Sequence, residues 1–168
     1  MSPTSTATPA AHIESNLKWI FQYTIDAYKT FEKLAENLPN PTSAAMFQNF
    51  AEEERHHRDL LEIKYLSGSE KINVTIVNDL RYQDMVEGNL SNQEIVETLI
   101  SQERAMGKKL MDAIKAAPPR DRNLLIYLAA GKRAHAALLE RELALVQVYP
   151  DWFQREDAES LIVHGHVA

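Results

Sequence analysis

The sequence predicts an all-α protein: a four-helix bundle of two antiparallel helical hairpins joined by a long crossover, with a short C-terminal extension. Apolar residues recur at alternating steps of three and four along four long segments, which is typical of helices packed side by side. The 168 residues include only 5 glycines and 7 prolines, and most of the prolines lie between these segments. A chain of this length corresponds to about one domain.

The first hairpin is expected from two long segments with a helical period. After a disordered tail at 1–12, the first helix covers about 13–38 and the second about 42–66. Pro39 and Pro41 separate the two helices, because proline cannot continue a helix. The loop is so short that the helices are expected to run antiparallel.

The connection between the hairpins breaks the helical pattern. Residues 67–89 contain Gly68 and Gly88 and show no clear helical period. A connection of this length can cross the whole bundle, which is one of the known bundle topologies. The alternative is an up-and-down bundle whose middle loop is floppy.

The second hairpin has clear boundaries. Ser91 and Glu94 form a capping box at the start of the third helix, in which each side chain binds an orphan backbone N–H of the other residue. A proline pair at 118–119 ends this helix and suits the first turn of the fourth helix, which covers about 120–148.

The bundle is expected to end at Pro150, so that it covers 13–150. The extension at 151–168 is expected to be partly helical. Four apolar residues of this extension are expected to dock on the bundle: Trp152, Phe153, Leu161 and Ile162.

The two hairpins resemble each other in sequence. Residues 51–62 (AEEERHHRDLLE) and 129–140 (AAGKRAHAALLE) share six identical positions, and His57 matches His135. Because both histidines fall at the same phase of their helices, we interpret the hairpins as copies of one ancestral hairpin. A chance resemblance between helices rich in alanine and leucine is the alternative.

Polar residues occupy the middle of the apolar face of every predicted helix. A carboxylate in an apolar core is costly unless it is paired or bound to a cation. Two such glutamates require a counter-charge, which a divalent metal ion or Lys132 can supply. The central positions are Thr24 on the first helix, Glu54 and His57 on the second, Glu103 on the third, and Lys132 and His135 on the fourth.

The helix phase also decides which of two Glu-x-x-His pairs is buried. It selects Glu54 with His57, because these residues continue the apolar face of the second helix. It places Glu52, Glu53 and His56 on the solvated side of the same helix.

The spacing Glu54-x-x-His57 puts both side chains on one helix face, where they can reach a common ion. With the segments at 51–57, 102–105 and 31–36, this motif resembles the ferritin-like superfamily, and rubrerythrin-type di-iron carboxylate domains in particular. The resemblance covers nearly all of the predicted bundle. It implies a ferritin-like fold and a centre of iron or another divalent transition metal, used for peroxide reduction, iron oxidation or other oxygen chemistry.

The chain departs from the family pattern at Thr24 and Lys132, which stand where the resemblance implies ligand carboxylates. A degenerate, reduced metal site is therefore expected, and two alternatives remain. In one, a single divalent ion is bound by four ligands: Glu54, His57, Glu103 and His135. In the other, Lys132 replaces the ion, since lysine is not a usual ligand of these metals, and a charge network holds the bundle together without metal.

Three functions are compatible with such a site. The first is a divergent rubrerythrin-like protein with a redox or oxidative-stress accessory role. The second is a competent di-iron oxidoreductase, in which water or a shifted side chain such as Asp26 replaces a lost glutamate. The third is a structural or partner-binding bundle without catalysis. The sequence contains no cysteine, so electron delivery through a rubredoxin-like domain is not expected.

The overall composition limits the kinds of partner that the protein is expected to bind. A formal net charge of −6 argues against non-specific binding to nucleic acid or to an anionic membrane. No signal peptide or membrane-spanning segment is evident, so a cytoplasmic protein is expected. Trp19, Tyr23 and Tyr28 are interpreted as packing or interface residues, and a homodimer is expected. The sequence does not indicate a redox partner.

Overall fold

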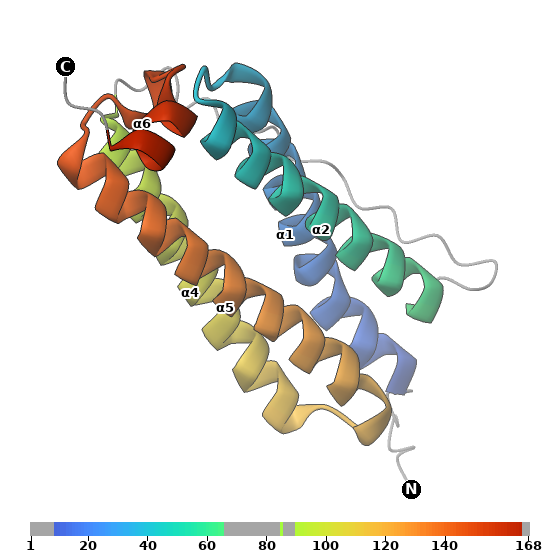
Figure 1. Cartoon of the computed structure of the whole chain (residues 1–168). Helices are drawn as coiled ribbons and strands as arrows, with labels where there is room; N and C mark the ends of the chain where they lie inside the picture. The colour runs from blue at the N-terminus through green and yellow to red at the C-terminus, as the bar shows by residue number, and fades with distance from the viewer. Residues whose placement is uncertain (1–8, 66–84, 86–89, 166–168) are drawn as a thin grey trace, which may run out of the picture.

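Helices make up all the regular structure in the described part of the chain. The computed structural model describes residues 9–65, 85 and 90–165, with side chains from residue 18 onward. Its helices are α1 (Pro9–Asn37), α2 (Pro41–Tyr65), α4 (Asn92–Ala116), α5 (Pro119–Val148), the 3-10 helix η1 (Trp152–Gln154) and α6 (Ala158–His164). This confirms the predicted all-α class (Figure 1). The predicted crossover at 67–89 lies outside the described residues apart from Met85.

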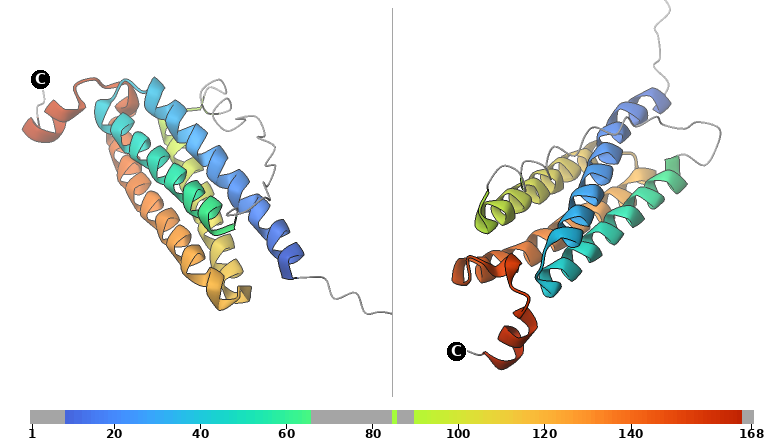
Figure 2. Two further views of the ribbon diagram at one scale, coloured as in Figure 1. Left: turned by 90° about the vertical axis from the view of Figure 1, so that its right-hand side faces the viewer. Right: turned by 90° about the horizontal axis from the view of Figure 1, so that it is seen from above.

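Four long helices form two antiparallel hairpins, as predicted. α1 packs along α2 and α4 packs along α5, and the hairpins lie side by side in each view (Figures 1 and 2). α1 begins at Pro9, earlier than the predicted start at 13. The predicted capping box begins α4, where Ser91 Oγ accepts from Glu94 N at 3.1 Å and Glu94 Oε2 accepts from Ser91 N at 2.8 Å.

Two apolar clusters fill the interior of the bundle. One lies near η1 and includes Phe31, Phe47, Phe50, Leu139 and Trp152. The other lies toward the opposite end and includes Ile20, Phe21, Leu61, Leu110 and Leu128. On α5, Lys132 and His135 fall between Leu128 of one cluster and Leu139 of the other. The polar residues predicted at the helix centres therefore form a buried layer, sealed at both ends by apolar side chains.

The C-terminal extension docks through fewer residues than predicted. Trp152 and Phe153 are fully buried, and Leu161 packs partly against the same core. Ile162 is 56% exposed, so the prediction that it docks is wrong. The physical reason is the short helix α6, in which consecutive residues point about 100° apart and only one of the two can face the bundle. No helix within the described residues is long and apolar enough to cross a membrane.

Candidate metal site

Three of the predicted ligands converge in the polar layer. Glu54 of α2, Glu103 of α4 and His135 of α5 each offer a ligand atom, and these atoms all lie within 4.8 Å of one another. Their residues are at most 1% exposed. Because each comes from a different helix, packing of the two hairpins creates the cluster.

His57 lies beside this group without belonging to it. Its Nδ1 is 3.5 Å from Glu54 Oε2, and its Nε2 is 3.9 Å from Glu53 Oε1. The ring lies against the backbone of Gly131 on α5, where an added Cβ would be only 2.8 Å from His57 Cε1. The structure thus brings His57 to the site but places its nitrogens at the edge of the ligand group.

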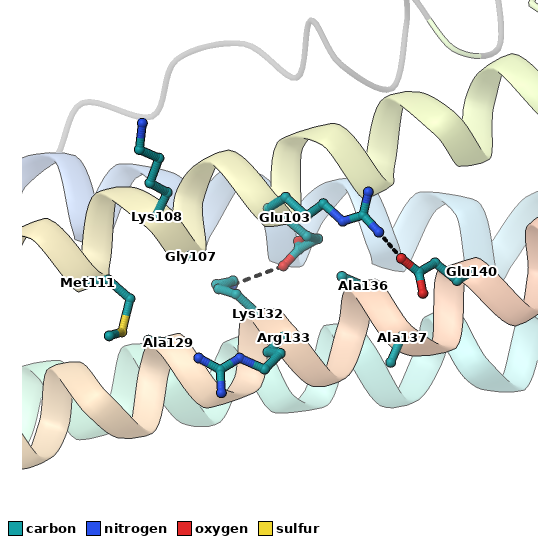
Figure 3. A pocket seen from close by; sticks show the side chains of 11 residues that line it. Glu103, Gly107, Lys108, Met111, Ala129, Lys132, Arg133, Ala136, Ala137 and Glu140 are labelled. Atoms are coloured by element: carbon teal, nitrogen blue, oxygen red, sulfur yellow. Dashed lines mark hydrogen bonds and ion pairs between the residues drawn. The ribbon is translucent and has the colours of Figure 1, made fainter.

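Lys132 occupies the position between the two carboxylates. Its Nζ makes an ion pair with Glu54 Oε1. This nitrogen lies 3.8 Å from Glu103 Oε2, the contact drawn in Figure 3. The same nitrogen is 4.7 Å from the centre of the Tyr23 ring, so it also makes a cation–π contact. With only 3% of its surface exposed, this ammonium is a buried counter-charge.

The other predicted site-modifying residue, Thr24, is also buried. Its hydroxyl donates to the carbonyl oxygen of Ile20 at 2.8 Å, one turn earlier in α1. This bond satisfies the hydroxyl within its own helix. Asp26, the suggested replacement for a lost carboxylate, accepts from Gln22 at 2.8 Å and is not part of the group of three ligands.

The charges of the layer favour the ionised forms of Glu54 and His135. Burial alone would raise the pKa of Glu54, but the ammonium of Lys132 and the imidazoles of His57 and His135 lower it to about 2. Burial disfavours the charged ring of His135, yet the carboxylates of Glu103 and Glu53 raise its pKa to about 9. The electrostatic field of the site is therefore strong enough to overcome desolvation at both groups.

Several buried atoms of the layer have no hydrogen-bond partner among the described residues. They are Glu54 Oε2, Glu103 Oε2, His135 Nδ1 and both ring nitrogens of His57. Glu103 Oε2 and His135 Nδ1 lie 3.5 Å apart, too far for a good hydrogen bond. Buried polar groups are normally satisfied, so these atoms, which lie at ion-pair distances from one another but make no hydrogen bond, are available to a further ligand.

Two residues of the site were not predicted to be there. Glu53 was expected on the solvated side, and its side chain is 40% exposed, but its Oε2 reaches inward to lie 2.8 Å from His135 Nε2. Tyr23 was interpreted only as a packing or interface residue, and its hydroxyl donates to Glu103 Oε1 at 2.9 Å. Helix spacing indicated both positions, because residues three or four apart share a helix face. Glu53 lies four residues before His57, and Tyr23 lies three residues after Ile20.

A pocket of about 370 Å³ lies between α4 and α5, with Glu103 and Lys132 among its lining residues. Arg104 and Glu140 make an ion pair across the two helices at this pocket, and Lys108 and Arg133 also line it (Figure 3). Glu103 and Lys132 of the buried layer therefore also border a surface pocket, whose lining holds both acidic and basic side chains.

Comparisons of the chain with protein-family models, with curated proteins and with solved structures found no match.

Proposed function

We propose that this protein is a divergent member of the ferritin-like group that binds one divalent transition-metal ion through Glu54, Glu103 and His135. The observation that carries the proposal is a set of buried atoms that make no hydrogen bond: Glu54 Oε2, Glu103 Oε2 and His135 Nδ1. Two carboxylates balance a divalent charge, and imidazole suits transition metals of borderline softness. Three protein ligands from three helices are enough to hold such an ion.

The residues around the ligands support the same proposal. Tyr23 binds Oε1 of Glu103 and leaves Oε2 free. Glu53 contacts His135 Nε2, so that Nδ1 is the ring nitrogen that faces Glu54 and Glu103. A histidine ligand commonly donates its second ring N–H to a carboxylate, which fixes the tautomer that binds metal.

Lys132 favours one ion over two. Its ammonium lies where the resemblance implies a carboxylate ligand, and it competes with a cation for Glu54. A bound iron or manganese ion would supply one-electron redox chemistry, which is the basis of a redox or oxidative-stress accessory role. The chain's own residues would hold the ion, set the tautomer of His135 and exclude bulk water.

A second candidate is a metal-free structural bundle, favoured by the direct ion pair between Lys132 and Glu54. In that case Lys132 is a permanent internal counter-charge and the protein has no redox chemistry. The third possibility, a two-iron oxidoreductase, requires Lys132 to leave the site.

Metal analysis of protein purified without chelators separates these functions. About one ion per chain supports the proposal, two irons support the oxidoreductase, and none, together with no uptake of added Mn(II), Fe(II) or Zn(II), supports the structural bundle. We expect Glu103→Gln and His135→Gln to weaken Zn(II) binding by more than roughly 100-fold, since even second-shell changes cost 10- to 100-fold. Matched controls are Glu97→Gln, also on α4, and His56→Gln, because both side chains are exposed and lie outside the ligand group.

Lys132→Glu tests why the site holds fewer ions than the family pattern implies. This change removes the competing ammonium and adds a carboxylate next to Glu54 and Glu103. We expect the variant to bind iron more tightly than the unmodified protein does. Unchanged iron binding would show that Lys132 does not limit the site.

A further inference from the structure

A groove runs along the solvent-exposed side of the second hairpin, between α4 and α5. The pocket of about 370 Å³ and a neighbouring pocket of about 520 Å³ share Arg104 and Glu140 in their linings, so the two hollows are continuous. Glu140 and Met111 mark the two ends of the first pocket (Figure 3). Two further charged residues of the lining, Glu103 and Lys132, are buried and belong to the polar layer. The rest of the lining is largely small or apolar and includes Ile100, Met111, Ala129, Ala136, Ala137 and Leu143.

The exposed charges of the groove are separated by sign along its length. On α4, Glu97 lies about three turns before Lys108, and on α5, Arg133 lies about two turns before Glu140. Since α4 and α5 are antiparallel, one end of the groove holds both glutamates and the other end holds Lys108 and Arg133. Glu140 pairs with Arg104, but Glu97, Lys108 and Arg133 make no ion pair within the described residues.

The two pairs of charges are centred at the same height in the hairpin. The midpoint of the pair on α4 falls between residues 102 and 103, and the midpoint of the pair on α5 falls between residues 136 and 137. Gly107 of α4 faces Lys132 of α5, because a Cβ added at Gly107 would lie 3.6 Å from Lys132 Cβ. Gly107 follows the first midpoint by as many residues as Lys132 precedes the second. In antiparallel helices with the same rise per residue, the two midpoints are therefore level.

We propose that this groove binds the same groove of a second copy of the chain, around a two-fold axis that crosses the hairpin at the level of the two midpoints. α4 then packs antiparallel on the partner's α4, and α5 packs antiparallel on the partner's α5. The groove linings become the interior of an intermolecular four-helix bundle. Each exposed cation without an ion pair faces a carboxylate: Lys108 faces the partner's Glu97, and Arg133 faces the partner's Glu140. Because the interface is self-complementary, each of these contacts is made twice.

The arrangement also avoids repulsion near the axis. Arg104, the exposed cation of the groove nearest the axis on α4, faces the partner's Ser101, which is uncharged. On α5, Ala136 faces the partner's Ala137, and such small side chains allow helices to pack closely. The inference is independent of the proposed function, because none of these contacts involves a metal ion.

Sedimentation of the full-length protein tests the proposal through charge reversal. We expect the unmodified protein to form a dimer. Lys108→Glu and Glu97→Lys should each weaken it by roughly 10- to 100-fold, since symmetry removes an ion pair twice and adds two repulsions. The double variant Glu97→Lys/Lys108→Glu restores both pairs with reversed sign, so it should regain much of the affinity. Lys109→Glu is the matched control, because Lys109 lies over the Trp19 ring and does not line the groove.

Cysteine cross-linking supplies a second measurement that does not depend on charge. The chain contains no cysteine, so a single introduced cysteine can form a disulfide only with another copy of the chain. Ala137→Cys lies next to the proposed axis and should give a disulfide-linked dimer on mild oxidation. Ala134→Cys is the control, because this position is also exposed on α5 but does not line the groove.

Four results would each overturn the proposal. The first is a protein that stays monomeric at every concentration measured, which would leave the groove to a partner other than this chain. The second is a dimer that Lys108→Glu and Lys109→Glu form equally well, which would place the interface on another face. The third is a double variant that dimerises no better than the single charge reversals. The fourth is equal cross-linking of Ala137→Cys and Ala134→Cys.

Discussion

Lys132→Met should destabilise the metal-free protein strongly. The variant leaves Glu54 and Glu103 buried without their ammonium partner. Removing one partner of a buried ion pair costs about 3–5 kcal/mol. The pKa of Glu54 gives a comparable figure, since its lowering from 4.5 to about 2 by Lys132 and two histidines corresponds to about 3 kcal/mol. For a protein of this size, each kcal/mol shifts Tm by roughly 2–4 °C, so a fall of about 6–20 °C is expected.

Thermal unfolding followed by circular dichroism in EDTA measures this loss. Lys109→Met serves as the control, because its ammonium is exposed and its contact with Trp19 contributes about 1 kcal/mol or less. Excess Zn(II) should return much of the stability to Lys132→Met, since a ligand at about 1,000 times its Kd contributes about 4 kcal/mol. The reasoning is refuted if the two variants unfold at the same temperature in EDTA, or if zinc raises both temperatures equally.

Three further predictions concern other groups. The folded-state pKa of His135 is raised from 6.5 to about 9, so its charge stabilises the fold fully below pH 6.5 and this contribution is lost as pH rises through 9. Between pH 6.5 and 9 in EDTA, the Tm of His135→Gln should therefore change less than the Tm of the unmodified protein. Gly131→Ala should lower Tm despite a gain in helix propensity of about 1 kcal/mol, whereas Gly107→Ala should not. Trp152→Phe removes the donor 2.7 Å from buried Glu142 Oε2 and should cost about 1–3 kcal/mol, measured by urea unfolding.

The polar layer could be predicted because helix periodicity fixes which residues share a face. Glu54 follows Phe50 on its helix face, Glu103 lies between Leu99 and Met106, and His135 precedes Leu139. A residue in such a place must enter the core with its neighbours, whatever its charge. Since all three lie near the middle of their helices, short loops within each hairpin bring them to the same height in the bundle.

Glu53 was missed because periodicity describes the direction of a backbone position and not the reach of a side chain. Its backbone lies beside the buried face of α2, so the residue remains 40% exposed. The flexible side chain nevertheless extends inward to a histidine on a helix of the other hairpin. Such a contact depends on the spacing of α2 and α5, which no pattern within either helix specifies.

The position of His57 depends on both halves of the repeat at once. In the first half, Glu53 and Glu54 form an acidic pair, and the matching positions in the second half are Gly131 and Lys132. Both residues of the second half act on the first half: Gly131 makes room for the ring of His57, and Lys132 pairs with Glu54. His57 consequently lies against α5 beside the ligand group, and one carboxylate of that group has a fixed positive partner. The two halves therefore contribute unequally to the layer, which combines a group of three possible ligands with one buried ammonium.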